Sequence, residues 1–316
     1  MDKNKKFLLS AAGIFISFFF FGLIQEKITK AQYVNPDGSV EKFTYSTSLV
    51  ITYCSMNYIF SLLILSIVKQ EDTTPCMYYS VSGLLYFLAM ICSNMALQFI
   101  SYPTQVIAKS CKPIPVMIFG VLLGKKSYPV RKYFFVGMVV IGVIMFMYKD
   151  KKEEKINKAE SEGIGIGELL VLSSLFMDGL YAAVQERMKA EFKTKSLCMM
   201  SQINKWATIF LLILWIVTKE IFSFAMFIQR QPNVLYKLGA LSVCGFFGQF
   251  SMITTVTEFG TLPAAIVANI RKFFTVLVSV LILGNSLLGR QWLATVVIFS
   301  GLFLDILYGK ADTKVK

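Results

Sequence analysis

The sequence predicts an all-α, polytopic membrane protein in which ten transmembrane helices form an inverted repeat of five plus five. The first observation is composition: 55% of the residues are hydrophobic and 16% are charged, whereas soluble domains carry about 25% charged residues. The second is that apolar residues occur in blocks of about 20, the length at which a helix crosses a bilayer. The third is a set of residues that recur in the second half of the chain at a fixed offset.

The first apolar block follows three lysines near the N-terminus and covers residues 7–25. It is longer than the apolar core of a typical signal peptide, and no clear small-residue cleavage site follows it. We therefore interpret it as a first membrane helix that begins in the cytosol. Nine further blocks predict the other helices, at about 47–68, 77–99, 103–123, 130–148, 167–185, 202–222, 235–257, 262–283 and 291–308.

Connections between the blocks are mostly short and favour antiparallel neighbours. The two longer ones are 26–46 and a Lys/Glu-rich stretch over 149–166. The second of these lies midway along the chain. We accordingly divide the chain into a first five-helix repeat (1–148), a connecting loop (149–166), a second five-helix repeat (167–309) and a cytosolic tail (310–316).

Matching residues support this division into repeats. Gln25-Glu26-Lys27 matches Gln185-Glu186-Arg187, 160 residues later. The same offset joins Phe99 to Phe259, Pro103 to Pro263, Ala108 to Ala268, Lys112 to Lys272 and Gly124 to Gly284, and an offset of 159 joins Arg131 to Arg290 and Gly142 to Gly301. Because each half holds an odd number of spans, the second half enters the membrane in the opposite orientation. Inverted repeats are typical of secondary transporters, whose substrate sites lie near the membrane midplane.

The loop charges set the predicted orientation. With a cytosolic N-terminus, the cytosolic loops carry a small excess of Lys and Arg over the opposite side, and the excess grows when the mixed-charge loop 149–166 is set aside. Cytosolic loops of membrane proteins are enriched in these residues. An even number of helices then places both termini in the cytosol.

Four cations lie within otherwise apolar spans, at matching places in the two halves: Lys109 and Lys112 in the fourth span, Arg271 and Lys272 in the ninth. A cation at the bilayer centre costs about 2.5–3.5 kcal/mol, which indicates an anionic ligand. Lys109 and Lys112 are three residues apart and share one helix face. Lys205, early in the seventh span, is either a fifth member of this group or a lysine that reaches the interface.

Two acids are candidates to neutralise these cations when no ligand is bound. Asp178 lies in the middle of the sixth span, and Glu26 lies at the end of the first. Glu26 is equally well interpreted as an ordinary charge at a helix end.

Composition also argues against several classes of protein. The chain has no histidine, and its six cysteines form no CxxC pair, so we predict neither a cofactor nor a metal site. The net charge of +13 is spread over short loops and a few intramembrane positions, so we predict no nucleic-acid partner. The alternatives that stay open are a polytopic transferase, which would need an acid pair or a metal-binding motif that is absent, and a receptor, which would not need cations at matching midplane positions.

The strings Lys109-Ser110-Cys111-Lys112-Pro113-Ile114-Pro115 and Arg271-Lys272-Phe273-Phe274 resemble the nucleotide-sugar transporter family of the drug/metabolite transporter superfamily. Tyr102-Pro103-Thr104-Gln105, Gly22-Leu23-Ile24-Gln25-Glu26-Lys27 and Gly301-Leu302-Phe303-Leu304-Asp305 resemble its endoplasmic-reticulum branch, the UDP-galactose transporter-related proteins. The resemblance covers nearly the whole chain.

This resemblance implies a ten-helix antiporter in the endoplasmic-reticulum membrane. It would exchange UDP-galactose or UDP-glucose for UMP, or ATP for ADP. Lys109, Lys112, Arg271 and Lys272 would bind phosphate, with Glu26 as a nearby polar or gating residue. The tail Lys314-Val315-Lys316 is an imperfect dilysine retrieval signal, which leaves the Golgi as the alternative location. The sequence does not select the base, the sugar, the direction of exchange or the oligomeric state.

Overall fold

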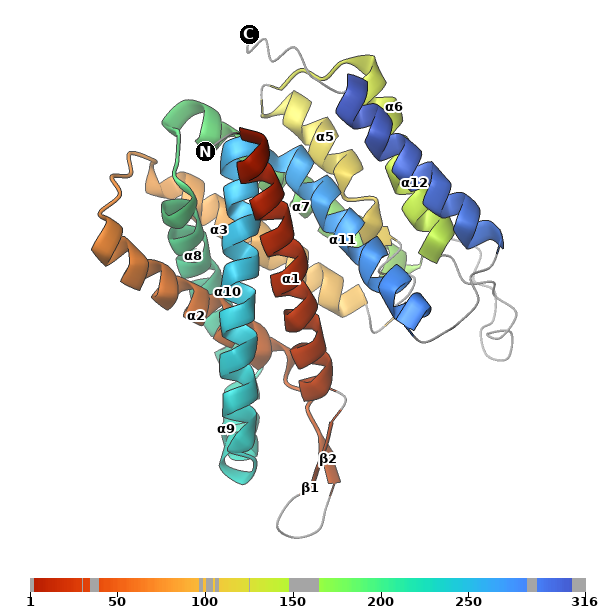
Figure 1. Ribbon diagram of the computed structural model, residues 1–316. Helices are drawn as coiled ribbons and strands as arrows, with labels where there is room; N and C mark the ends of the chain where they lie inside the picture. The colour runs from red at the N-terminus through yellow and green to blue at the C-terminus, as the bar shows by residue number, and fades with distance from the viewer. Residues whose placement is uncertain are drawn as a thin grey trace. The chain divides into compact units, whose positions relative to one another are not determined.

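The computed structural model of the chain is almost entirely helical (Figure 1). It describes residues 3–29, 31–34, 40–96, 99–100, 105, 108–124, 126–147, 165–282 and 289–308. The elements in chain order are α1 (Lys3–Thr29), β1 (Gln32–Val34), β2 (Val40–Lys42), α2 (Ser46–Val68), α3 (Cys76–Ala96), α5 (Pro113–Leu122), α6 (Val130–Met147), α7 (Ile166–Phe192), α8 (Ser196–Val217), α9 (Glu220–Arg230), α10 (Asn233–Phe259), α11 (Thr261–Ile282) and α12 (Gly289–Tyr308).

Six of the described helices are long and apolar enough to cross a membrane: α1, α2, α3, α7, α8 and α10. Two shorter apolar helical segments, Pro113–Leu122 and Trp292–Gly301, accompany them. Many apolar side chains on these helices are exposed, such as Ile16 on α1 and Leu63 on α2. Exposed apolar surface on this scale suits contact with lipid. The structure therefore confirms a polytopic helical membrane protein.

Two elements of the structure are absent from the sequence-based assignment. The long connection 26–46 contains the antiparallel hairpin of β1 and β2, in which Tyr33 pairs with Glu41. The seventh predicted span, 202–222, extends too far, because α8 ends at Val217 and a separate helix, α9, begins at Glu220. Phe227 of α9 is buried, while Phe222 is exposed. The hairpin was missed because three-residue strands give little periodic signal beside membrane spans. α9 does carry a helical pattern of apolar residues, but its start was assigned to the seventh predicted span.

The described contacts divide the chain into two compact units. Unit 1 comprises Met1–Phe87 and Met188–Gly260, and unit 2 comprises Leu88–Arg187 and Thr261–Lys316. Each unit takes segments from both halves of the chain. The units are therefore not the two sequence repeats, whose boundaries stay a prediction.

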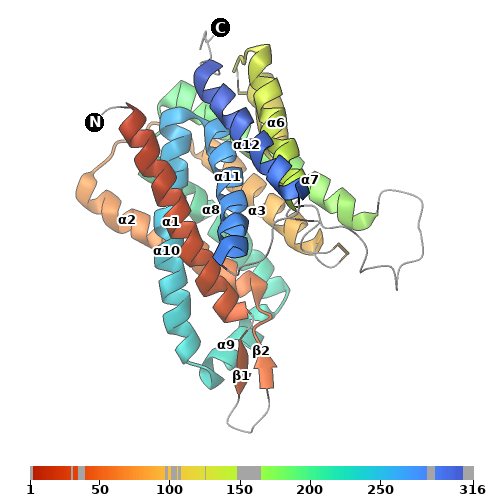
Figure 2. The ribbon, with the colours of Figure 1, turned by 45° about the vertical axis from the view of Figure 1, so that its right-hand side comes forward.

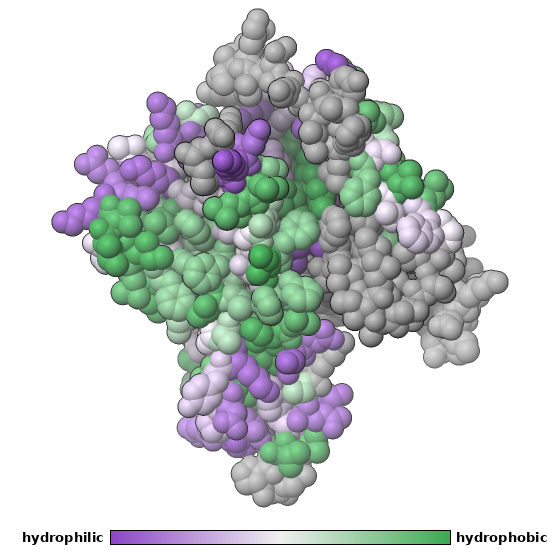
Figure 3. All heavy atoms as spheres, viewed as in Figure 1, coloured by the Kyte–Doolittle hydropathy of each residue, from purple (hydrophilic) through white to green (hydrophobic). Residues whose placement is uncertain are grey.

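In unit 1, α1 packs along α10 and α2 packs against α8. The pair α1 and α10 lies side by side in both ribbon views (Figures 1 and 2). A buried cluster joins the hairpin to α9 and the start of α10 through Tyr33, Phe43, Phe227 and Leu238. On the face of this unit seen in Figure 3, apolar residues form a middle band with hydrophilic residues toward both ends, as expected for a bundle that crosses a bilayer.

In unit 2, α6 packs along α12, and α5 packs against α11. The contact between α6 and α12 depends on small residues. A Cβ added at Gly142 would come 2.7 Å from Ile298 Cγ1 and 3.2 Å from the carbonyl oxygen of Ala294. Gly301 faces α6 in the same way, with Met138 Cβ at 3.1 Å from a Cβ placed there. Gly142 and Gly301 are the pair that matched at an offset of 159, and each allows close helix packing.

Candidate functional site

Asp178 of α7 binds both lysines of the fourth predicted span. Its Oδ2 lies 2.8 Å from Lys109 Nζ, and its Oδ1 lies 2.9 Å from Lys112 Nζ. The Asp178 side chain is 10% exposed, and those of Lys109 and Lys112 are 18% and 33% exposed. The expectation that Asp178 neutralises these cations in the ligand-free protein therefore agrees with the geometry.

Lys109 lies in a short helical segment, residues 108–110, and Lys112 lies in the turn between this segment and the next helix. Cys111 N donates to Ala108 O at 3.0 Å and Lys112 N to Lys109 O at 3.3 Å, so the hydrogen bonds here join residues three apart. α5 begins immediately afterwards at Pro113. Proline is well tolerated in the first turn of a helix but lacks the N–H that would continue an earlier one. The two prolines after Lys112 thus explain why the lysines lie on a break between helical segments.

Lys109 is held from a second side. Its Nζ donates to Ser174 Oγ at 2.5 Å, and Ser174 Oγ in turn donates to the backbone carbonyl of Ala89. Lys112 donates through Nζ to Asp178, and its side chain is the more exposed of the two. Lys109 is therefore the anchored lysine and Lys112 the more accessible one.

A glycine brings Asp178 close to the lysine-bearing segment. Gly179 follows Asp178, and a Cβ there would come 2.6 Å from Phe119 Cδ2 and 3.0 Å from the Pro115 carbonyl oxygen. α5 and α7 thus approach each other at the residue next to the acid. Because Gly179 has no side chain, the two helices come close enough for the Asp178 carboxylate to reach the ammonium groups of Lys109 and Lys112.

The ninth predicted span also contacts this group. Asn269 of α11 is buried and donates through Nδ2 to the backbone carbonyl of Ser110, between the two lysines. Arg271 follows two residues later and is half-buried. Lys272 lies in the same helix, but its side chain is outside the described residues. The backbone of α11 is therefore anchored to the turn that carries Lys109 and Lys112.

Three polar residues of this site were not predicted. Ser174 lies four residues before Asp178 and so on the same face of α7. Asn269 lies 160 residues after Lys109, which makes it the repeat equivalent of that lysine. Ser110 takes part through its backbone carbonyl, for which no side-chain signal exists. Helical spacing and the repeat offset were the signals that could have identified the first two.

Glu26 and Lys205 belong to unit 1, whereas the other five predicted site residues belong to unit 2. Glu26 lies in the last turn of α1 and is exposed, and Lys205 is half-buried on α8. Their participation in the site stays a prediction.

A second buried acid in unit 2 has a different environment. Glu186 of α7 is 1% exposed. Its Oε1 accepts hydrogen bonds from the backbone amide and the hydroxyl of Thr261, the first residue of α11. Its Oε2 lies 3.1 Å from Lys126 Nζ. Glu186 matches Glu26 in the predicted repeat, and Glu26 is exposed, so the two matched acids have different environments.

The group around Asp178 suits reversible binding of an anion. Two lysines and one aspartate leave one positive charge uncompensated. Buried ion pairs contribute little net stability compared with apolar packing, so stability alone does not explain the group. Ammonium groups bind phosphate well as point charges. A phosphorylated ligand could therefore replace the Asp178 carboxylate at one or both lysines.

Comparison with known proteins agrees with this chemistry. Residues 6–309 match the model of the UAA transporter family. A Drosophila melanogaster protein named solute carrier family 35 member B1 homolog is 45% identical over 315 residues, which is 98% of this chain and 92% of the relative. The Danio rerio solute carrier family 35 member B1 is 40% identical, covering 99% of this chain and 95% of its own length.

A third relative, solute carrier family 35 member B1 of Rattus norvegicus, is 41% identical over 304 residues, which is 96% of this chain and 93% of the relative. These relatives are named as solute carriers and not as enzymes. The matches confirm the resemblance to nucleotide-sugar transporters that the lysine and arginine motifs indicated. The chain belongs to the UAA transporter family.

Proposed function

We propose that this protein is an antiporter that exchanges phosphorylated nucleotides across the endoplasmic-reticulum membrane. Its substrates would be UDP-galactose or UDP-glucose exchanged for UMP, or ATP exchanged for ADP. Lys109, Lys112, Arg271 and Lys272 would bind the phosphates. The observation that carries the proposal is the binding of one carboxylate, Asp178, by both Lys109 and Lys112.

In this mechanism the substrate competes with Asp178. A di- or triphosphate brings more negative charge than the carboxylate and neutralises the whole group, whereas the ligand-free group keeps uncompensated positive charge. Moving that charge through the membrane is costly. The ligand-free carrier would therefore change its orientation slowly, and a bound nucleotide on each side would be needed for rapid turnover.

Alternating access would use ten helices in two inverted repeats. Three pairs of helices that occupy matching places in the predicted repeats pack together, namely α2 with α8, α5 with α11, and α6 with α12, although α1 packs along α10. Such pairing is expected when two repeats are related by an axis in the membrane plane. The lysine excess of the cytosolic loops supports placing both termini in the cytosol.

The choice between the two substrate classes needs a transport assay. The purified full-length protein would be reconstituted into liposomes loaded with ADP, with UMP or with buffer, and uptake of labelled ATP, UDP-galactose and UDP-glucose compared. ATP uptake stimulated only by internal ADP would identify an adenine-nucleotide exchanger. UDP-sugar uptake stimulated by internal UMP would identify a nucleotide-sugar antiporter. Uptake of none of these nucleotides under any loading would overturn the proposal.

A further inference from the structure

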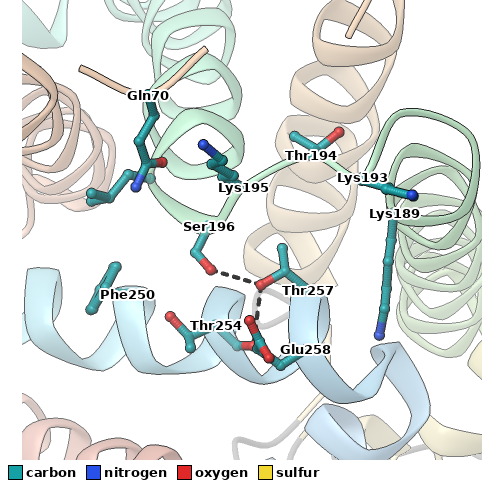
Figure 4. Close-up of a pocket in the computed structure, with 11 residues that line it drawn as sticks. Gln70, Lys189, Lys193, Thr194, Lys195, Ser196, Phe250, Thr254, Thr257 and Glu258 are labelled. Carbon is teal, nitrogen blue, oxygen red and sulfur yellow. Dashed lines mark hydrogen bonds between the residues drawn. The ribbon is translucent and has the colours of Figure 1, made fainter. Parts of the chain in front are cut away.

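Unit 1 contains a cavity of about 560 Å³ that the proposed transport mechanism does not use (Figure 4). Its volume is within the range of about 300–1,000 Å³ typical of small-molecule sites. The residues that matter most in its lining are three lysines, Lys189, Lys193 and Lys195, and three hydroxyl residues, Ser196, Thr254 and Thr257. The apolar residues of the lining are Leu197 and Phe250, and the other lining residues are polar or charged.

The lining carries an excess of positive charge. Its single acid, Glu258, has Oε2 3.8 Å from Lys6 Nζ, so a lysine outside the lining already faces that carboxylate. Lys189 is half-buried, and its Nζ lies 3.4 Å from the carbonyl oxygen of Val256, near the end of α10. Lys193 and Lys195 are exposed, so their side chains can turn toward a ligand. An anionic ligand would meet three ammonium groups and one acid that is already paired.

Neutral hydrogen-bond donors line the same space. α8 begins at Ser196 beside the cavity, and no side chain caps this N-terminus. The amides of a first helical turn attract anions. Ser196 and Thr257 share a hydrogen bond of 2.7 Å between their hydroxyls, which Figure 4 shows at the centre of the lining. Thr254 Oγ1 is shielded from solvent and has no hydrogen-bond partner among the described residues. A ligand with several oxygen atoms would satisfy these donors.

Most of the lining lies at or near helix ends. Residues 193–195 join α7 to α8, Gln70 follows the end of α2, and Glu258 is in the last turn of α10. Lys6, which faces Glu258, is in the first turns of α1. The cavity therefore lies at the membrane surface on the side of the N-terminus, which the lysine distribution assigns to the cytosol.

Lysines at cytosolic helix ends commonly serve only to orient a membrane protein. That role requires neither a cavity of this size nor a shielded hydroxyl without a partner beside the lysines. Basic pockets at the cytosolic ends of membrane helices do bind phosphorylated lipid headgroups. The combination of cavity, charge and donors thus favours a ligand.

We infer that this lysine-lined cavity is a second binding site, for the phosphate groups of an anionic ligand at the cytosolic surface of unit 1. The phosphates could belong to the headgroup of a phosphoinositide lipid or to a free nucleotide, because both present phosphate oxygens at this surface. The inference does not require the transport function, since it concerns binding.

The test measures binding to the purified full-length protein in detergent, by thermal stabilisation, with two probes: short-chain phosphatidylinositol 4-phosphate and ADP. The site variant is Lys193→Gln combined with Lys195→Gln. The matched control is Lys219→Gln, because Lys219 is also exposed, also lies next to α8, and has a φ of 56° close to the 52° of Lys193. Lys112→Gln removes a lysine of the proposed transport site in unit 2, so any binding that this variant retains is assigned to the second site.

If the phosphoinositide binds the wild type, the double variant should weaken that binding by about tenfold or more, equivalent to about 1.4 kcal/mol, while Lys219→Gln leaves it unchanged. The ligand is then a lipid. If ADP still binds the Lys112→Gln variant and the double variant abolishes that remaining binding, the ligand is a nucleotide. If the double variant binds both probes as the wild type does, or if neither probe binds once Lys112 is replaced, the inferred site is overturned.

Discussion

The carboxylate of Asp178 lies 2.8 Å from the ammonium group of Lys109, and its second oxygen lies 2.9 Å from that of Lys112. Three residues from two predicted membrane spans thus form one charge group inside unit 2. The group explains how a predicted membrane span can carry two lysines three residues apart, because the acid lowers the cost of both charges. In the proposed mechanism, Asp178 is also the internal anion that a substrate phosphate displaces.

Neutralising Asp178 should change how strongly nucleotide uptake depends on a nucleotide on the opposite side of the membrane. Asp178→Asn leaves both lysines without their acid, and removing one partner of a buried ion pair costs about 3–5 kcal/mol. We therefore expect a lower midpoint of thermal unfolding without nucleotide, a several-fold higher apparent affinity for the transported nucleotide, and a larger ratio of exchange to uptake into empty liposomes. Thermal unfolding and uptake kinetics measure these three quantities.

Glu168→Gln is the matched control for Asp178→Asn. Glu168 is an exposed acid in the first turn of the same helix, α7, so its neutralisation should leave affinity and coupling unchanged. An Asp178→Asn protein with wild-type affinity and a wild-type exchange ratio would show that the carboxylate does not compete with substrate.

Glu186 and Lys126, which form an ion pair, should respond to mutation as a coupled pair. Lys126→Met leaves the Glu186 carboxylate buried without its cation, whereas the combination Lys126→Met/Glu186→Gln removes both charges. Because the uncompensated charge is the costly state, the double variant should unfold at a higher temperature than Lys126→Met alone. Coupling energies of about 0.5–3 kcal/mol are typical of such contacts. A double variant that unfolds at the same temperature as Lys126→Met, or at a lower one, would contradict this expectation.

Glu186 has a second function that a different pair of substitutions isolates. Glu186→Gln keeps an oxygen that can accept the amide hydrogen of Thr261, but Glu186→Ala does not. Since an unsatisfied buried amide costs about 1–3 kcal/mol, Glu186→Ala should unfold at the lower temperature. Equal unfolding temperatures would show that the bond to Thr261 does not stabilise the start of α11.

The packing of α6 against α12 should depend on Gly142. A leucine at this position would collide with Ile298 and with the backbone at Ala294, because even a Cβ comes within 2.7 Å and 3.2 Å of them. Overpacking of this kind costs about 1–3 kcal/mol or more. We expect Gly142→Leu to lower the yield of monodisperse protein and its unfolding temperature, measured by size-exclusion chromatography and a thermal scan.

Gly137 on the same helix provides the control for Gly142, since a Cβ added there meets nothing within 4 Å. Gly137→Leu should behave as the wild type in both measurements. Equal behaviour of the two leucine variants would exclude close packing at Gly142 as a determinant of stability.

The sequence predicted the membrane helices and the charged residues of the candidate site better than it predicted which side chains contact one another. Runs of apolar residues located every described membrane helix, because burial in lipid imposes length and composition directly. The intramembrane position of Asp178 identified it as a counter-ion for the lysines. Ser174 and Asn269 were missed because their roles depend on which helix faces meet. The hairpin of β1 and β2 is stabilised by tertiary contacts of Tyr33 and Phe43, which local sequence does not encode.

The most direct test of the central claim is nucleotide exchange by the Lys112→Gln variant. Lys112 is the more accessible lysine of the Asp178 group, and the account makes it a ligand of the substrate phosphates. Uptake of the matching external nucleotide by the wild type should be faster into liposomes loaded with ADP or UMP than into empty liposomes. The stimulated rate of the variant should be at least about tenfold lower, equivalent to about 1.4 kcal/mol in activation free energy. Arg131→Gln, which removes an exposed cation from α6, should retain the wild-type rate. Wild-type exchange by a correctly folded Lys112→Gln protein would contradict the assignment of this cluster as the phosphate site.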